Sequence, residues 1–212
     1  MAYILEELQS LLELYNISNS KVAVNYIRRF IPAYGNLKLF IEQLLLNEDL
    51  TNIVIRYQRG FLNNCSHALD LLQYLVGGPI KLENLIKGNI VNDHFDNDPT
   101  ISAIAKWNNI NISMVGLAHV LFSHFEIDLY FKYYRIAIKD AGNSIEIFKA
   151  DIGEGFLNPL KIQDHLCSYN CLNNYMLHIS DHAYKLLHQE ETRDNFAEAV
   201  HLNKSLLEYI NI

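Results

Sequence analysis

The stretch from Gly60 to Gly78, GFLNNCSHALDLLQYLVGG, joins a polar loop to an amphipathic helix, and the other segments are arranged around this unit. Its second half has apolar residues at helical spacing. Ser66 is a good residue to cap the start of the helix, because its hydroxyl can accept a hydrogen bond from a free backbone N–H group. Gly77, Gly78 and Pro79 are expected to end the helix. The core-facing stripe is predicted to consist of Leu69, Leu72, Leu75 and Val76.

The histidine at the start of this helix has two interpretations. His67 lies three residues before Asp70 and therefore on the same helical face. A histidine in such a place either packs or caps as a structural residue, or takes part in binding and catalysis. Spacing alone favours the structural role, so a functional role needs support from other segments.

The bulk composition is that of a globular protein. A chain of 212 residues can bury a full core, as one large domain or two small ones. Half of the residues are apolar and 19% are charged, which is typical of neither disordered chains nor membrane spans. The net charge of −7 disfavours a nucleic-acid partner, since phosphate binding needs a basic face. The longest apolar runs are too short for a membrane span, and no signal-like segment is present.

The three cysteines do not form the even set of a disulfide framework, so we expect a reducing, cytoplasmic location. Cys167 and Cys171 lie four residues apart, close to His165, His178 and His182. The count resembles that of a zinc site, but a helical pattern in this region explains the spacing equally well. We therefore predict no metal site.

The N-terminal segments suggest part of a larger unit. Residues 3 to 15 are predicted to form an amphipathic helix. Lys21 to Ile27 is predicted to be a buried strand, because a run of apolar, partly β-branched residues is typical of a strand covered on both faces. A second helix is expected from Ala33 to Leu46. A helix followed by a buried strand resembles the middle of a βαβ unit whose first strand is missing.

The middle of the chain is rich in predicted strands. They cover Leu50–Arg59, Leu82–Val91, Thr100–Trp107, Ile110–Leu117, Phe125–Tyr133, Tyr134–Lys139 and Ser144–Lys149. Asn108-Asn109 is a two-residue hairpin turn. The polar loop from Asn92 to Pro99 does not have the spacing of a calcium loop and is expected to be a solvated turn. Two helices, about Asp164–Gln189 and Asn195–Ile210, close the chain.

The order of elements predicts an α+β fold. It consists of a predominantly antiparallel sheet with helices on one face, preceded by a helix–strand stub. An antiparallel sheet can leave its other face free, and the alternation from Glu126 to Phe131 places large apolar groups on one side of a strand. We expect a free sheet face to pair with a second copy of the chain, which predicts a homo-oligomer.

Three stretches together resemble the family named after glucose–fructose oxidoreductase, inositol dehydrogenase and the rhizopine-catabolism protein (Gfo/Idh/MocA). Lys21 to Pro32, KVAVNYIRRFIP, is similar to the family's last Rossmann strand and the crossing into its second domain. His67 to Gly77, HALDLLQYLVG, is similar to its active-site helix. The third is the strand series with a hairpin around Asp140 to Ser144, followed by the helix from Asn195 to Tyr209. Their order covers nearly all of the chain.

This resemblance implies that a dinucleotide-binding half is absent. The family has an N-terminal domain whose glycine-rich turn seats a pyrophosphate, and no G-x-G-x-x-G occurs in this sequence. The family's Glu-Lys-Pro motif is absent too. Residues 1–30 are then the remnant of a dinucleotide-binding domain, and residues 31–212 are a substrate-binding and oligomerisation domain. The chain is either an excised domain or the product of a truncated gene.

The resemblance also implies the site residues. His67 matches the family's catalytic histidine. The family usually has an aspartate four residues earlier, where this chain has Asn63. An amide can orient an imidazole but cannot compensate an imidazolium with charge, so His67 is expected to be a weaker base. The residues expected to hold substrate hydroxyls or a carboxylate are Asn64, Tyr26, Arg28, Arg29 and Tyr57. For Arg28 and Arg29 a structural role at the crossing remains equally open, and for the tyrosines packing is favoured.

The implied function is that of the substrate-binding half of an NAD- or NADP-dependent oxidoreductase acting on a sugar or polyol. Without the nucleotide site, this chain is not expected to bind the cofactor tightly or to transfer hydride alone. The alternative is a non-catalytic module that dimerises or binds sugars. Either way, residues 3 to 15 and Lys21 to Ile27 are expected to be more exposed than in an intact enzyme, or packed against another copy, because their neighbours are absent.

Overall fold

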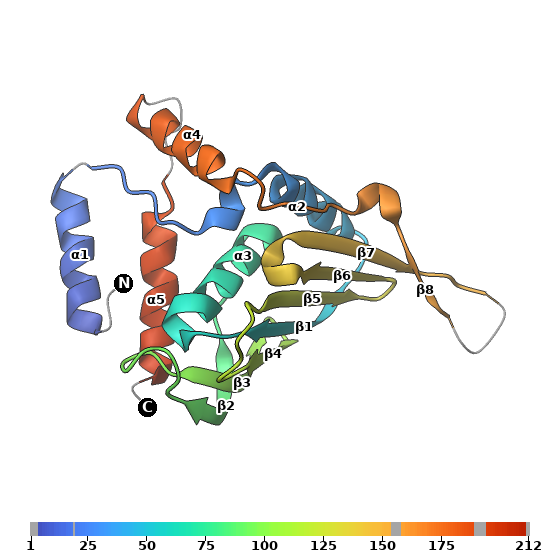
Figure 1. The fold of residues 1–212 in the computed structure, drawn as a ribbon, viewed down its shortest axis with the longest axis horizontal. Helices are drawn as coiled ribbons and strands as arrows, with labels where there is room; N and C mark the ends of the chain where they lie inside the picture. The colour runs from blue at the N-terminus through green and yellow to red at the C-terminus, as the bar shows by residue number, and fades with distance from the viewer. Residues whose placement is uncertain (1–3, 19, 154–157, 189–193, 211–212) are drawn as a thin grey trace.

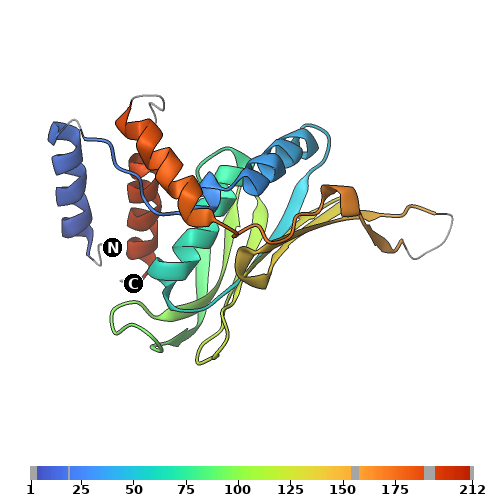
Figure 2. The ribbon, with the colours of Figure 1, turned by 45° about the horizontal axis from the view of Figure 1, so that its top comes forward.

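The computed structural model describes residues 4–18, 20–153, 158–188 and 194–210. A single sheet runs through the molecule, with α2 and α3 against one of its faces and α1, α4 and α5 continuing the helical layer at one end (Figure 1). Figure 2 shows the same two layers from another side. The helices are α1 (Leu5–Ser18), α2 (Pro32–Leu45), α3 (Ser66–Val76), α4 (Tyr175–Leu187) and α5 (Phe196–Ile210). The predicted α+β class is confirmed.

The sheet has eight strands in the order β2-β3-β4-β1-β5-β6-β7-β8. They are β1 (Leu50–Tyr57), β2 (Glu83–Val91), β3 (Thr100–Trp107), β4 (Ile110–Gly116), β5 (Phe125–Phe131), β6 (Tyr134–Lys139), β7 (Ser144–Ala150) and β8 (Leu160–Ile162). Six neighbouring pairs are antiparallel and only β1 and β4 run parallel, so the sheet is predominantly antiparallel as predicted. The sequence did not reveal β8, which has three residues.

Helix α3 is at the centre of the hydrophobic core. Eight of its eleven residues are buried, so the helix is covered on nearly all sides rather than along one stripe. The predicted stripe is confirmed for Leu69, Leu72 and Leu75, and Val76 is half-buried. Each fully buried leucine stabilises the fold by about 1.5–3 kcal/mol relative to an exposed one. The core therefore fixes the position of α3 and of the side chains in its first turn.

The predicted turns at both ends of this region are present. Gly77 has a φ of +75° and its N–H donates to the Gln73 carbonyl oxygen, as a left-handed cap requires. Asn108 and Asn109 have φ values of +47° and +66° and connect β3 to β4 in a two-residue hairpin. Both turns follow from local chemistry, because glycine and asparagine tolerate positive φ.

The prediction of a strand from Lys21 to Ile27 is wrong. Residues 20–26 pair with no strand among the described residues, and η1 (Ile27–Phe30) is a 3₁₀ helix. The Val22 N–H donates to Asp194 at 3.0 Å, and the backbone of Val24 forms two hydrogen bonds with the Asn195 side chain, at 2.7 and 2.9 Å. Side chains at the start of α5 thus satisfy backbone groups that a neighbouring strand would otherwise satisfy.

The long helix predicted from Asp164 to Gln189 is also wrong at its start. The chain forms a short 3₁₀ turn at Asp164–Leu166 and becomes α-helical only at Tyr175, after Asn174 with a φ of +57°. The segment between them forms a bridge with β7, where Ser168 and Ile145 exchange backbone hydrogen bonds of 2.8 and 2.9 Å. Tertiary pairing therefore replaces the first half of the predicted helix. Gln189 lies outside the described residues.

Helix α1 is poorly covered. Leu8 is its only buried residue, whereas Leu11, Leu14 and Ile17 are 46%, 58% and 79% exposed. Helix α1 is thus largely exposed, whereas a greater exposure than in an intact enzyme stays a prediction, both for this helix and for Lys21 to Ile27. Single exposed leucines are ordinary on protein surfaces, but a row of them along one helix indicates an unpartnered face.

One face of the sheet is not covered by the described helices (Figure 2). The large apolar residues of β5 do not lie on it: Ile127 and Leu129 are fully buried in the core. The free face instead carries an ion network in which Asp128 accepts hydrogen bonds from Arg56 at 2.7 Å and from Arg135 at 2.8 Å. Further along this face the apolar residues Ile86 and Ile104 are 70% and 57% exposed.

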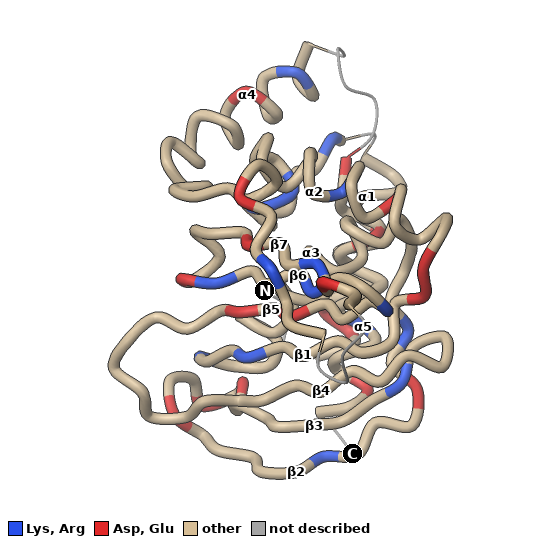
Figure 3. The backbone as a smooth tube through the Cα atoms, turned by 90° about the vertical axis from the view of Figure 1, so that its right-hand side faces the viewer, with Lys and Arg blue, Asp and Glu red and all other residues tan. Residues whose placement is uncertain are grey.

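Acidic and basic positions are interspersed along the backbone (Figure 3). The described residues contain no helix that is both long enough and apolar enough to cross a membrane.

Candidate functional site

The turn before α3 has an unusual backbone. η2 (Gly60–Cys65) is a π-helix that continues directly into α3, and π-helical turns inside helices are frequent at functional sites. Ser66 consequently does not cap the helix as predicted. It is already helical, with φ −57° and ψ −39°, and its hydroxyl donates to the Asn63 carbonyl oxygen at 2.9 Å.

The cap comes instead from Asp98, which lies in the loop between β2 and β3. Its carboxylate accepts hydrogen bonds from the N–H groups of Leu62 at 2.7 Å and Asn63 at 2.8 Å. The loop from Asn92 to Pro99 was predicted to be a solvated turn, and for Asp98 this is wrong, since the residue is fully buried. A carboxylate far away in sequence thus satisfies the orphan donors of the helix start.

Gly60 is required by the same arrangement. Its φ of +88° lies in the left-handed region, and a Cβ at this position would be 2.1 Å from Oδ2 of Asp98. The Gly60 N–H donates to the Thr100 hydroxyl at 3.1 Å. Gly60, Asp98 and Thr100 therefore hold the π-helical turn in a single position.

His67 lies in the first turn of α3 and contacts Tyr26, whose ring meets the imidazole edge-on at a centroid distance of 4.9 Å. Within the described residues the imidazole makes no hydrogen bond to the protein. Burial, with a further contribution from the Arg28 guanidinium, lowers the pKa of His67 to about 4. His67 is therefore neutral at pH 7 and keeps hydrogen-bonding capacity for a ligand.

Asn63 does not orient this imidazole directly. Its side-chain amide donates to the carbonyl oxygen of Arg59 at 3.1 Å, and the amide of Asn64 donates to the Gln58 carbonyl oxygen at 2.8 Å. Both asparagines thus stabilise the π-helical turn. Each still has a side-chain oxygen with acceptor capacity for a substrate hydroxyl.

The two neighbouring arginines have different surroundings. Arg29 forms ion pairs of 2.6 Å with both Asp70 and Glu198, which tie η1 to α3 and α5. Burial raises the pKa of Asp70 to about 7, and Arg29 opposes part of that rise. Arg28 stacks on the ring of Phe125, with 3.6 Å between its guanidinium carbon and the ring centroid. Arg28 thus lies on an aromatic ring, from where its charge lowers the pKa of His67, and Arg29 is engaged in ion pairs with α3 and α5.

Both tyrosines predicted to contact substrate are buried. The Tyr57 hydroxyl donates to the Ile101 carbonyl oxygen at 2.6 Å and accepts from the Ile101 N–H at 3.0 Å, and the side chain is fully buried. Tyr57 is positioned as a packing residue. Tyr26 is 4% exposed, and its hydroxyl accepts a hydrogen bond from Asn203 at 3.0 Å. Its ring forms one wall around His67.

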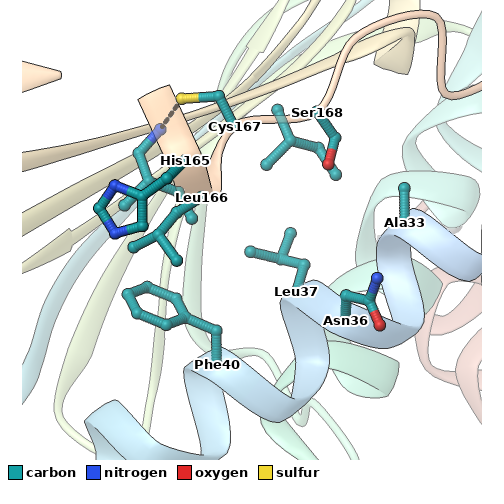
Figure 4. Close-up of a pocket in the computed structure, with 10 residues that line it drawn as sticks. Ala33, Asn36, Leu37, Phe40, His165, Leu166, Cys167 and Ser168 are labelled. Carbon is teal, nitrogen blue, oxygen red and sulfur yellow. Dashed lines mark hydrogen bonds between the residues drawn. The ribbon is translucent and has the colours of Figure 1, made fainter. Parts of the chain in front are cut away.

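A cavity of about 180 Å³ lies elsewhere, between α2 and β7 (Figure 4). Leu37 and Phe40 of α2 face Leu166 and Cys167 across it. Cys167 is held by its own segment and by β7: its thiol donates to the Gln163 carbonyl oxygen and accepts from the Ile147 N–H, each at 3.4 Å. The cavity does not include His67.

Among the described residues, no group of three or more His, Cys, Asp and Glu side chains is placed to hold a metal ion. A dinucleotide does not fit this part of the chain either. The described parallel strands are β1 and β4 alone, and the turn after β1 is occupied by the buried Asp98 carboxylate, which would repel a pyrophosphate. The structure thus contains no Rossmann phosphate turn in its described residues.

No protein-family model matches the sequence, and no curated protein matches it. Solved structures do match. A super-repressor mutant of Gal80p from Saccharomyces cerevisiae has a TM-score of 0.74 at 12% identity, over 99% of this chain and 68% of that one. Levoglucosan dehydrogenase in complex with NADH and levoglucosan has a TM-score of 0.68 at 12% identity, over 98% and 68%. The dehydrogenase MviM from Clostridium difficile has a TM-score of 0.61 at 19% identity, over 99% and 68%.

The match extends over nearly the whole of this chain but over only about two thirds of each of these structures. The chain therefore has the fold that dehydrogenases and oxidoreductases of the glucose–fructose oxidoreductase, inositol dehydrogenase and rhizopine-catabolism type share over that part of their length.

Proposed function

We propose that this chain is the substrate-binding half of a sugar or polyol oxidoreductase of that family, with its substrate site at His67. Residues 31–212 are the substrate-binding and oligomerisation domain, and residues 1–30 belong to the dinucleotide-binding half. The exposed apolar row of α1 and the segment at residues 20–26, which pairs with no strand in the described parts, support this division.

The observation that carries the proposal is the state of His67. Its imidazole is fixed by a buried helix and a buried tyrosine, yet makes no hydrogen bond within the described residues. A residue held so firmly without a protein partner is preorganised for a ligand. Structures with the same fold include a dehydrogenase bound to NADH and levoglucosan, and the sequence match of His67 to the family's histidine agrees with such a site.

In this proposal His67 accepts the proton of a substrate hydroxyl. The neutral imidazole present at pH 7 has the free lone pair that a base needs. Its pKa of about 4 makes it a weak base, because both burial and Arg28 disfavour the imidazolium. Asn63 supplies no compensating charge. The oxygens of Asn64 and Asn63 are available to hold neighbouring hydroxyl groups.

The nicotinamide cofactor, NAD or NADP, would accept or supply hydride in the complete enzyme. Because the described residues do not fit a dinucleotide, we expect this chain alone to bind neither cofactor tightly. Calorimetric titration with NADH and NADPH is expected to give a dissociation constant weaker than about 1 mM. Micromolar binding of either would contradict this division between the two halves.

The substrate site can be tested without the cofactor. In saturation-transfer NMR, a panel of sugars and polyols is expected to contain members that bind the 212-residue chain and lose binding in His67→Gln. His201→Gln, an exposed histidine of α5, is the matched control. If no member binds, or if both variants behave like the wild type, the site does not lie at His67.

A non-catalytic module is the second candidate. The specific observation in its favour is that the same fold occurs in Gal80p, of which the matched structure is a super-repressor mutant, so the fold itself does not imply catalysis. The two candidates differ in one measurable property. A full-length protein with activity that depends on His67 is an oxidoreductase, and one that binds sugars without turnover in the presence of either cofactor is a binding module.

We also propose that the free sheet face pairs with a second copy of the chain. The exposed Ile86 and Ile104 supply apolar area. The adjacent charges are paired, since Asp128 and Glu126 together balance Arg56 and Arg135, which lowers the desolvation cost of covering them. A twofold axis would place this self-complementary face against its own copy.

A further inference from the structure

Arg28 and Arg29 are adjacent in sequence but differ in their counterions. Arg29 is neutralised twice, by Asp70 and Glu198. For Arg28, no ion pair with an acidic side chain exists in the described part of the chain. Two neighbouring guanidinium groups in the same short helix therefore carry out different tasks, one inside the core and one beside His67.

The Arg28 side chain is fixed in place by neutral groups. Its guanidinium stacks on Phe125, and Nη2 donates to the Ala141 carbonyl oxygen at 2.7 Å. The backbone of Gly142 lies so close that a Cβ there would be 2.4 Å from Nε of Arg28. Nε is buried and has no hydrogen-bond partner among the residues that the structure describes. The neutral Tyr34 hydroxyl also forms a side-chain hydrogen bond with the guanidinium. Among the described residues, however, no acidic side chain pairs with Arg28.

A largely buried cation without a counterion is costly to maintain. Charged groups removed from water are normally paired, because desolvation is not otherwise repaid. Stacking on an aromatic ring returns only about 0.5–2 kcal/mol. The unpartnered Nε, and the lack of an acidic partner for Arg28 among the described residues, therefore indicate a cation whose partner arrives with a ligand. The ligand lies beside His67, because the segment that carries Arg28 runs along this side of α3: Tyr26 contacts the imidazole at 4.9 Å and Arg29 pairs with Asp70 at 2.6 Å. The Arg28 charge also lowers the pKa of His67.

We propose that the substrate of this site is a sugar acid, an aldonate or uronate, whose carboxylate pairs with Arg28 while a hydroxyl contacts His67. This inference rests on the proposed function and narrows its substrate class from neutral polyols to carboxylates. One cation matches the single negative charge of a carboxylate better than the double charge of a phosphate. The chain carries a net charge of −7, so an anion needs such a local cation.

The experiment compares each acid with its neutral isostere. The probes are D-gluconate, D-glucuronate and D-galacturonate, with their primary amides, and D-glucose 6-phosphate as the dianion. Binding to the wild-type chain is followed by saturation-transfer NMR and by the shifts of the histidine ring signals. At least one acid is expected to bind about tenfold or more tightly than its amide and than the phosphate, since a charge-assisted hydrogen bond is lost in the amide.

Two variants locate the charge. Arg28→Gln is expected to abolish the preference for the acid over the amide, and Arg28→Lys to retain part of it. Lys161→Gln removes the same charge from an exposed position on β8 and is expected to leave the preference unchanged. If Arg28→Gln does not fold, the comparison of acid and amide binding to the wild-type chain still decides whether the site prefers a carboxylate.

The outcomes separate this inference from the proposed function. Equal binding of acid and amide would overturn the sugar-acid substrate and leave a neutral-sugar site at His67. A preference for the acid that persists in Arg28→Gln would overturn the role of Arg28. Binding of none of these acids would overturn the inference, whereas the broader sugar and polyol panel would still decide the proposed function.

Discussion

His67 lies in the first turn of α3, and its protonation is linked to folding. In the folded chain its pKa is about 4, against an ordinary value of 6.5. Between these values the unfolded state binds more protons than the folded state, so the free energy of unfolding falls as the pH falls through this window.

The linkage predicts a difference between the wild type and His67→Gln. Relative to the variant, the wild type is expected to lose about 2–3 kcal/mol of unfolding free energy between pH 7 and pH 4. Urea denaturation of both proteins at several pH values measures it. His201→Gln, with an exposed histidine removed, is the control and should follow the wild type. A constant difference between wild type and His67→Gln across the window would show that the histidine is not buried as described.

The close approach of Gly60 to the Asp98 carboxylate leads to a second prediction. Gly60→Ala is expected to cost more than about 2 kcal/mol, because the methyl group meets the Asp98 carboxylate and the backbone has positive φ. Gly78→Ala is the matched control, since nothing lies within 4 Å of its Cβ position, and its cost should be below about 1 kcal/mol. Thermal denaturation compares them. Equal losses in the two variants would contradict the Asp98 cap.

The parts of the candidate site that could be predicted from the sequence are those whose contacts are local along the chain. The glycine-led loop, the amphipathic helix and the glycine stop around His67 could be predicted because that pattern is local, whereas the role of His67 rests on the family resemblance and stays a prediction. Asp98 was missed because its partners, Leu62 and Asn63, are about 35 residues away along the chain. No periodicity marks a carboxylate that caps a distant helix.

At the scale of elements, the crossing η1 is connected to the helical layer by Arg29. Its two carboxylate partners come from α3 and α5, so one side chain joins three elements. Asp70 is almost completely buried, and within the described part of the chain its Oδ1 has no hydrogen-bond partner. A buried ion pair of this kind specifies a position more than it stabilises the fold.

Removing the ion pair between Arg29 and Asp70 is expected to lower the free energy of unfolding. Asp70→Ala leaves the Arg29 charge with Glu198 alone and should lower the unfolding free energy by about 3–5 kcal/mol. Glu42→Gln removes one partner of the exposed Lys38–Glu42 pair of α2 and should change it by less than about 0.5 kcal/mol. Urea denaturation at pH 8 measures both. An Asp70→Ala variant as stable as Glu42→Gln would show that η1 is not held through Arg29.

Element prediction succeeded where pairing is local and failed where it is not. The hairpin at Asn108-Asn109 needs only its own two residues. Lys21 to Ile27 has the composition of a buried strand, but in this chain Asp194 and Asn195 satisfy its backbone, so no strand forms. The helix predicted after Asp164 was lost to pairing between Ser168 and Ile145. Composition specifies what a segment favours, and the available neighbours decide the outcome.

At the scale of the whole molecule, the sheet separates a covered face from a free one. The order of strands and helices predicted the α+β class, because layers follow from the alternation of apolar and polar residues. The same alternation did not reveal the composition of the free face, where Arg56 and Arg135 enclose Asp128.

Pairing through the free face is tested by sedimentation. At about 100 µM the wild type is expected to sediment as a dimer and Ile104→Glu as a monomer, because a carboxylate in an apolar interface costs several kcal/mol unless it is paired. Leu39→Glu on α2 is the matched control, because Leu39 is 59% exposed and Ile104 is 57% exposed. This variant is expected to remain dimeric. A monomeric wild type, or dimers of Ile104→Glu, would exclude this interface.

The central claim is that the start of α3 is a substrate site, and the histidine ring signals of the intact chain test it most directly. On titration with sugars, polyols and sugar acids, the account predicts saturable shifts of the His67 ring signals, identified by their loss in His67→Gln. Signals of His165, at the cavity between α2 and β7, should stay unchanged. Shifts at His165 without any at His67, or no shift at His67 with any member of the panel, would contradict it.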